Sequence, residues 1–341
     1  MKRSFFLLVA ILGLSFVSNV TFAAAPFYQG KTIRIIVGLS AGGGYDIWAR
    51  TIGRHIGKYI PGRPTVIVDN MPGAGSIIAA NHVYKVAKPD GLTIGHVSGY
   101  VFLNQLFKQA GIEFDARKYE YIGAPYVDEM VVFVTKASGI TSMEKWFNAK
   151  TPVRFGGQAV GSTSSDNVPR VLRAALGLPV KTVTGYKGTA EVKLAVESRE
   201  LDGNCLTWES GKATWGKAME AGDIIPLLAV IPKPLAEAPH VPLAINYAKT
   251  EEARQLIEMG VHQPPVFARP FMLPPGTPKD RVQMLRNAFE ATMRDKEFLA
   301  EVEKTRMTTM PVTAEGLEKA IHGIFNLDPA MVDKLKDILL K

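Results

Sequence analysis

The chain has 341 residues, of which 47% are hydrophobic and 21% are charged, and its formal net charge is +8. These fractions are typical of a globular protein and exclude a disordered or fibrous chain. Lysine and arginine form no dense block of the kind that binds nucleic acid, so we expect no nucleic-acid partner, and the mild positive excess suits a small anionic ligand.

The first residues have the pattern of a secretory signal peptide. Residues 2 and 3 are basic, residues 5–17 form an apolar run, and residues 21–25 supply the small side chains that a signal peptidase needs. The apolar run is short for a membrane span, although an uncleaved anchor helix is the alternative. We therefore predict that residues 1–24 are removed and that the mature protein is periplasmic. The single cysteine, Cys205, permits no intrachain disulfide.

The first predicted unit combines a strand, a glycine turn and a helix. Residues 33–39 are a β-branched apolar run with the length of a buried strand. The turn Ser40-Ala41-Gly42-Gly43-Gly44 follows, and Tyr45-Asp46 opens a helical pattern that runs to residue 60. A helix that begins directly after such a turn leaves backbone N–H groups free at the positive end of its dipole. The sequence therefore predicts an anion site at residues 40–46.

The same arrangement occurs twice more in the first hundred residues. A strand at 64–68 leads through the turn that contains Gly75 and Ser76 to a helix at 77–86. A strand at 92–97 ends at Ser98 before a helical pattern around 102–107. Successive strand–turn–helix units indicate a parallel sheet with right-handed crossovers. Ligands of such sheets bind outside the carboxyl ends of the strands, where these turns lie.

The rest of the chain predicts a second α/β section and a helical tail. We expect strands at 119–123, 130–134, 153–155, 180–183, 204–208 and 224–231, and helices at 144–147, 168–176, 190–198, 281–293, 296–304, 314–326 and 329–340. This order predicts an α/β protein of two lobes. Lobe 1 comprises residues 25–125 and 236–341, and lobe 2 comprises residues 126–235.

Most catalytic chemistries lack their motifs in this chain. The polyglycine turn has neither dinucleotide-binding spacing nor the lysine of a phosphate-binding loop, and the six histidines stand singly, without metal-ligand spacing. No nucleophile motif of acyl transfer is present. We predict a binding protein with no catalytic residue, metal or cofactor. The alternative is a secreted hydrolytic enzyme that uses cleft carboxylates such as Asp46, Asp166 or Glu209.

Several segments resemble one receptor family. They are GKTIRIIVGLSAGGGYDIWAR at 30–50, PTVIVDNMPGAGSIIAANHVYKVAKPDGLTIG at 64–95, the glycine- and serine-rich segment 155–203, and LPPGTPKDRVQMLRNAFEATMRD at 273–295. Together they are similar to the extracytoplasmic solute receptors of tripartite tricarboxylate transporters, also called Bug-type receptors. The resemblance covers essentially the whole mature chain, and the paired AGGGYD and NMPGAGS turns are its most specific part.

The resemblance implies a type II periplasmic-binding-protein fold in which each lobe is a mostly parallel sheet flanked by helices. It implies a monomeric receptor that closes on a small carboxylate ligand and delivers it to the membrane permease subunits of the transporter. The first-lobe turns would hold the carboxylate through backbone N–H groups and ordered water. Carried over by position, the ligand-binding residues are Ser40, Ala41, Gly42, Gly43, Gly44, Tyr45, Asp46, Gly75, Ser76, Ser98, Gln158, Gly161, Ser162, Thr163, Tyr186 and Glu209.

Two positions depart from the family pattern. Asp166 stands where the family commonly has histidine, and Glu209 is acidic where a dicarboxylate would be repelled. Glu209 could therefore favour a ligand with an amine or hydroxyl at its far end. In the first turn, Gly43 is expected to need a positive φ, so Gly43→Val should abolish binding while the lobe still folds.

Overall fold

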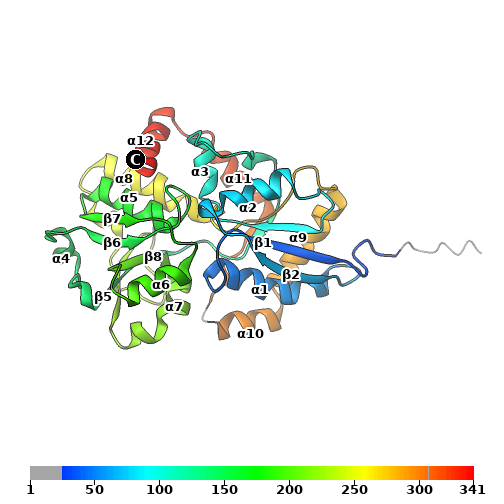
Figure 1. Cartoon of the computed structure of the whole chain (residues 1–341), viewed down its shortest axis with the longest axis horizontal. Coiled ribbons are helices and arrows are strands. Elements are labelled where there is room, and N and C mark those ends of the chain that lie inside the picture. The colour runs from blue at the N-terminus through cyan, green and yellow to red at the C-terminus, as the bar shows by residue number, and fades with distance from the viewer. Residues whose placement is uncertain (1–24, 306) are drawn as a thin grey trace, which may run out of the picture.

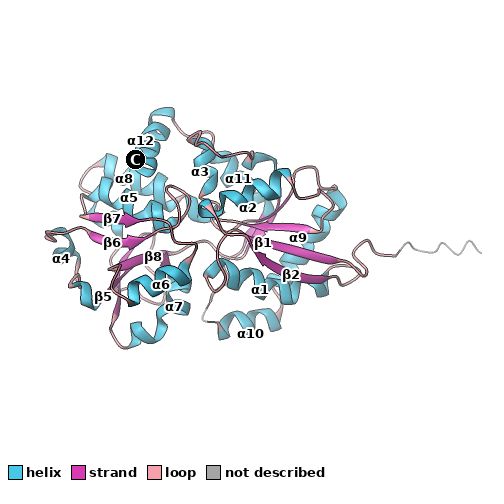
Figure 2. Cartoon of the chain, in the orientation of Figure 1, coloured by secondary structure: helices cyan, strands magenta, loops and turns pink. Residues whose placement is uncertain are grey.

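The computed structural model describes residues 25–305 and 307–341, so the predicted signal peptide lies outside the described residues. The strands form two sheets, and each sheet lies in its own lobe with helices around it (Figure 1). The two lobes lie side by side, and chain segments pass between them in the middle of the molecule (Figure 2).

The first sheet has the strand order β11-β4-β10-β3-β1-β2. Its strands are β1 (Thr32–Val37), β2 (Thr65–Asn70), β3 (Thr93–His96), β4 (Glu120–Ala124), β10 (Phe271–Leu273) and β11 (Val312–Thr313). β1 pairs in parallel with β2 and β3, as the strand–turn–helix units predict. β10 enters between β3 and β4 and is antiparallel to both. The sheet is therefore mixed, because the chain adds β10 on its return from the second lobe.

The second sheet has the order β7-β6-β8-β5-β9. Its strands are β5 (Met130–Thr135), β6 (Val153–Gly156), β7 (Val180–Val183), β8 (Gly203–Thr207) and β9 (Ile224–Ala229). β7, β6 and β8 are parallel, whereas β5 is antiparallel to β8 and β9. Both sheets thus combine a parallel three-stranded part with an antiparallel part next to the crossing segments.

Helices cover both faces of each sheet. The helices next to the first sheet are α1 (Gly44–Ile56), α2 (Ile77–Lys85), α3 (Val101–Leu106), α9 (Lys279–Met293), α10 (Lys296–Lys304) and α11 (Ala314–Ile324). Those of the second lobe are α4 (Met143–Phe147), α5 (Ser164–Leu176), α6 (Thr189–Glu197), α7 (Trp208–Glu220), α8 (Glu251–Ile257) and α12 (Pro329–Leu340). No helix in the described part of the chain is both long and apolar enough to cross a bilayer.

The C-terminal segments are shared between the lobes. α9, α10 and α11 pack on the first lobe, whereas α8 and α12 pack against α5 in the second. The chain thus crosses between the lobes after β4, before β10 and again between α11 and α12 (Figure 1). The division into lobes of residues 25–125 plus 236–341 and residues 126–235 remains a prediction. The contacts show on which sheet's lobe each C-terminal helix packs.

The hydrophobic cores bury both faces of the first sheet. Along β1, Ile33, Ile35 and Val37 pack with Trp48 of α1, while Ile36 faces the opposite side of the sheet. This alternation buries both faces, as expected for strands with helices on either side. Because the helices hold both faces, the functional turns can only project from the strand ends.

Candidate functional site

A cavity between the lobes lies where strands of both sheets end and helices begin. It is lined by Leu39, Gly44, Tyr45, Gln158, Thr163, Ser164, Ser165, Thr189, Leu206, Thr207, Ser210 and Arg269. Its volume is about 30 Å³ for the centres of water-sized molecules, which leaves room for about two waters. In this conformation the lobes therefore leave only a small space between them at this point.

Four helix N-termini face this cavity. Gly44 and Tyr45 begin α1, Ser164 and Ser165 begin α5, and Thr189 begins α6. α7 contributes its cap residue Thr207 and the first-turn Ser210. Each helix N-terminus carries a partial charge of about +0.5 and unpaired N–H groups. Their convergence favours an anion in this cavity.

Arg269 forms the wall of the cavity nearest to the crossing segments. It lies between a short 3-10 turn, Pro264–Phe267, and β10, while Asp128 lies in the other crossing segment between β4 and β5. Arg269 Nε donates to Asp128 Oδ1 at 2.5 Å, and both side chains are at most 4% exposed. The pair therefore joins two crossings between the lobes.

Burial controls the charges of this pair. Burial raises the pKa of Asp128, the Arg269 guanidinium opposes that rise, and Glu209 adds to it, which gives a pKa of about 6. The pKa of Arg269 is raised although burial would lower it, because Asp128 and Glu209 stabilise its charge. Arg269 thus remains a cation in a dry environment, where its interactions are strong.

The second lobe holds the other side of the guanidinium. Arg269 Nη2 lies 3.2 Å from Glu209 Oε1 and 3.2 Å from Thr207 Oγ1, and the Tyr45 ring centre is 4.8 Å from the guanidinium carbon. Glu209 Oε1 also accepts hydrogen bonds from the hydroxyls of Thr207 and Ser210, at 3.0 and 3.2 Å. Glu209 therefore orients two hydroxyl groups that line the cavity.

A second polar network centres on Gln158 at the end of β6. Its Oε1 accepts hydrogen bonds from Thr163 Oγ1 at 2.5 Å and Ser165 Oγ at 2.9 Å. Asp166 Oδ2 accepts from the Gln158 backbone N–H at 3.0 Å and contacts the Thr163 hydroxyl. Burial raises the pKa of Asp166 to about 7, against the lowering effect of these bonds and of Arg170. This side of the cavity is rich in hydroxyls and has an acid that is easily protonated.

Comparison with known proteins identifies the fold that carries this site. The family model described as "Tripartite tricarboxylate transporter family receptor" matches residues 49–336. The chain belongs to this family. A UPF0065 protein of Bordetella pertussis is 25% identical to it over 304 residues, which cover 87% of each chain.

Solved structures share the architecture of this receptor. The periplasmic binding protein BugD has a TM-score of 0.74 at 20% identity, with 92% of this chain and 99% of BugD covered. MatC from Rhodopseudomonas palustris with bound malate has a TM-score of 0.69 at 16% identity, with 91% of this chain and 99% of MatC covered. The predicted family and the predicted two-lobed α/β fold are both confirmed.

Several predicted site residues of the receptor meet across the lobes beside the cavity. The Ser98 hydroxyl donates to the Ser162 carbonyl at 2.7 Å, and the Ser98 backbone N–H donates to Ser76 Oγ at 3.1 Å. Gly75, with φ +61°, lies so close to Ser162 that a Cβ would be 1.7 Å from its hydroxyl oxygen. Gly161, with φ +76°, precedes this contact. Gly75, Ser76, Ser98, Gly161 and Ser162 form an interlobe contact, which we call the serine bridge.

Other predicted residues of the first turn lie at the rim. The Ser40 backbone N–H donates to the Lys187 carbonyl of the second lobe at 3.2 Å, while Ala41 and Gly42 are exposed. Asp46 accepts from the Gly42 N–H at 2.9 Å and pairs with Arg50 at 2.9 Å. Burial would raise the pKa of Asp46, but these partners hold it below its usual value.

One predicted effect loses its geometric reason in the structure, and one predicted residue lies outside the cavity lining. Gly43 has φ −91°, and the positive φ of the turn, +82°, belongs to Gly42. The predicted effect of Gly43→Val through a positive φ is therefore wrong, because a Cβ on Gly43 would simply face Thr189 at 3.3 Å. Tyr186 does not line the cavity, since its hydroxyl donates to Glu200 on the exposed side of the lobe.

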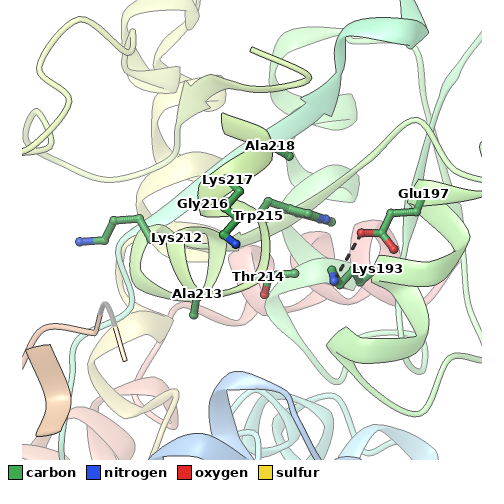
Figure 3. A pocket seen from close by; sticks show the side chains of 9 residues that line it. All are labelled: Lys193, Glu197, Lys212, Ala213, Thr214, Trp215, Gly216, Lys217 and Ala218. Atoms are coloured by element: carbon green, nitrogen blue, oxygen red, sulfur yellow. Dashed lines mark ion pairs between the residues drawn. The ribbon is translucent and has the colours of Figure 1, made fainter. Parts of the chain in front are cut away.

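A larger hollow of about 380 Å³ lies elsewhere on the second lobe, between α6 and α7 (Figure 3). It is lined by three lysines and by Trp215, but two of the lysines are paired. Lys193 pairs with Glu197 at 3.4 Å, the contact drawn in Figure 3, and Lys212 pairs with Glu237 at 2.7 Å. Charges that are solvated and paired bind a ligand weakly, so the interlobe cavity is the better candidate.

Sequence reasoning found part of the cavity and missed its charged wall. Gly44, Tyr45, Gln158 and Thr163 were predicted and do line it. The missed residues are Arg269, Thr207, Ser210, Thr189, Ser164 and Ser165, together with Asp128 behind Arg269. The available signal was Arg269 itself, the one charge in the apolar run 264–273, because a charge in such a run is usually buried and paired.

Proposed function

We propose that this receptor captures a small carboxylate-bearing ligand by closure of its two lobes and delivers it to the membrane permease subunits of a tripartite transporter. The observation that carries the proposal is the convergence of α1, α5, α6 and α7, which point their N-termini at one enclosed cavity. A carboxylate is the small anion that this arrangement favours, and the malate bound to MatC supports the choice by analogy.

The small volume of the cavity supports capture of the ligand by lobe closure. The cavity holds about two waters, so a carboxylate can enter only if the lobes separate. Polar contacts that span the lobes include the serine bridge and the Ser40–Lys187 hydrogen bond. Opening and closing about the crossing segments, which is a common motion in binding proteins, would break and re-form these contacts.

The proposal includes the route to the periplasm. The signal-peptide pattern in residues 1–24 predicts export, and the receptors of this family act outside the cytoplasm. We propose that the mature chain is a periplasmic monomer. Mass spectrometry of the protein purified from the periplasm should show an N-terminus at residue 24 or 25.

A ligand screen tests the proposed function. The mature protein is heated with monocarboxylates, dicarboxylates, tricarboxylates, amino acids and aromatic acids. A binder raises stability by about 2.7 kcal/mol when its concentration is 100 times the dissociation constant, and calorimetry then gives the affinity. Stabilisation by a carboxylate without its consumption supports the receptor. Esters and amides of the same acids are incubated with the protein in parallel. Their consumption, with no stabilisation by any acid, would support the hydrolytic alternative instead.

A further inference from the structure

We infer that Arg269 is the charged contact for the ligand carboxylate, through its Nη1 group, and that its surroundings favour a ligand with a single carboxylate. The inference rests on the proposed function, because it assigns a residue and a ligand charge to that site.

The hydrogen bonds of Arg269 leave one side of the guanidinium free. Nε is bonded to Asp128, and Nη2 is bonded to Thr207 and Ser210 and lies beside Glu209. Nη1 is buried and has no hydrogen-bond partner among the described residues. Because buried polar groups are nearly always paired, the two N–H groups of Nη1 are available to a ligand or to ordered water.

The free side of the guanidinium points to the start of α1. A Cβ on Gly44 would lie 3.1 Å from Arg269 Nη1 and 3.4 Å from Nη2, so glycine permits the close approach of this helix terminus to the guanidinium. The first turn of α1, at Gly44 and Tyr45, and Arg269 therefore meet in the lining of one cavity. A carboxylate at that point would receive charge-assisted hydrogen bonds from the side chain and ordinary ones from the backbone.

The partners of Arg269 fix its position and not merely its charge. Asp128 belongs to a crossing segment and Glu209 to the first turn of α7, so the guanidinium is held from two directions. Tyr45 packs on its face. A guanidinium held in one orientation loses little entropy when it binds a planar carboxylate.

The charges around the site favour a monoanion. Arg269 contributes +1, Asp128 and Glu209 contribute −2, and four helix N-termini contribute about +2 in total, so the sum is about +1. Asp46 is neutralised by Arg50, and Asp166, whose pKa is about 7, is opposed by the charge of Arg170. One ligand carboxylate balances this site, whereas a second would be in excess and close to Glu209 and Asp166.

The test compares matched ligands and matched variants by calorimetry. The ligands are the carboxylate that gives the largest stabilisation in the screen, its primary amide, and the pair succinate and succinamate. The main variant combines Arg269→Gln with Asp128→Asn and Glu209→Gln, so that no buried charge is left unpaired. Arg269→Lys is the second variant because it keeps the positive charge between Asp128 and Glu209 while it removes the guanidinium. Arg286→Gln is the control, since Arg286 pairs with Glu318 far from the cavity.

If Arg269 contacts the carboxylate, the triple variant should bind the carboxylate at least about 30-fold more weakly, in line with the loss of a charge-assisted bond, and bind the amide with unchanged affinity. Arg269→Lys should recover part of the loss, and Arg286→Gln should behave as wild type. Succinamate should bind wild type more tightly than succinate.

An equal loss for acid and amide, or full affinity in the folded triple variant, would refute the Arg269 contact. Tighter binding of succinate would refute the single-charge preference. If wild type binds no carboxylate, the proposed function itself fails.

Discussion

The two sides of the cavity attract an anion by different means. The first lobe offers backbone N–H groups from the turn before α1, and it contributes the polar side chain of Tyr45 to the lining. The opposite side offers side chains: Arg269 from a crossing segment, and hydroxyls from α5, α6 and α7. The backbone side can accept a carboxylate from many ligands, whereas the side-chain side depends on charge and shape. The difference suggests that affinity and selectivity are located on opposite walls, and the following substitutions separate the two.

The largest effect is expected at Gly44, where the walls meet. In Gly44→Val the new side chain would contact Ser210 Oγ and Arg269 Nη1, because even a Cβ would approach them to 2.4 and 3.1 Å. The lobes could not close, so calorimetry should show an affinity lower by about 100-fold or more, which is the scale of about 3 kcal/mol of overpacking. The first lobe should still fold, because residue 44 has ordinary helical backbone.

Gly42→Ala is the matched control for that change. Gly42 has φ +82° and nothing within 4 Å of its Cβ position, so alanine strains the backbone without blocking closure. It should lower the free energy of unfolding by about 1 kcal/mol and leave affinity within a factor of three. Strong binding by Gly44→Val, or loss of binding only in Gly42→Ala, would contradict the assignment of the first wall.

The next effect is a pH dependence on the side-chain wall. The pKa of Asp166 is about 7 in the folded state and about 3.9 in an unfolded chain. Between these values the folded protein binds the extra proton, so stability falls as pH rises from about 4 to about 7. Asp166→Asn should remove that slope, by a few kcal/mol over the range. Denaturant unfolding of both proteins at several pH values measures the slope. Asp128 titrates in both proteins, so its contribution cancels in the comparison. Parallel profiles would mean that Asp166 ionises normally.

A smaller effect is expected at the serine bridge, which ties the two walls together. Ser98→Ala removes the hydrogen bond from the Ser98 hydroxyl to the Ser162 carbonyl. If the bond forms only on closure, its loss of about 1 kcal/mol should weaken ligand binding about fivefold, with little change in the unfolding midpoint without ligand. Ser138→Ala serves as control, since its hydroxyl bonds within one lobe to the Thr135 carbonyl. Equal affinities of the two variants would show that the bridge forms independently of the ligand.

The smallest effect is expected at Tyr186, a residue that the family resemblance places at the ligand. Its hydroxyl donates to Glu200. Burial, and to a lesser extent this hydrogen bond, raise the pKa of Tyr186 to about 12. Tyr186→Phe should therefore change the dissociation constant by less than about twofold. A tenfold loss would restore Tyr186 to the ligand-binding residues.

These expectations show which parts of the receptor are readable from sequence. The first wall is local, because a strand, a glycine turn and a helix follow one another between residues 32 and 56, and one stretch of sequence encodes the whole geometry. The other strands were predicted for the same reason, because each is an apolar run whose strand pattern is contained within its own few residues. The antiparallel placement of β10 was not predicted, because a three-residue strand has no period of its own.

The second wall is assembled from distant residues. Asp128 and Arg269 are separated by 141 positions, and Glu209 lies between them in sequence without any fixed spacing to either. Their meeting depends on two crossing segments and on the start of α7, a helix that the sequence did not indicate because Gly211 and Gly216 interrupt its pattern. Such a site becomes visible only when the topology is known.

The docking of α12 on the second lobe has a practical consequence. The described chain starts beside the first sheet, whereas Lys341 ends on the second lobe, and the two ends point in different directions (Figure 1). A donor fluorophore at one end and an acceptor at the other would therefore report the angle between the lobes. The receptor could be turned into an optical sensor for its own ligand without a substitution in the cavity.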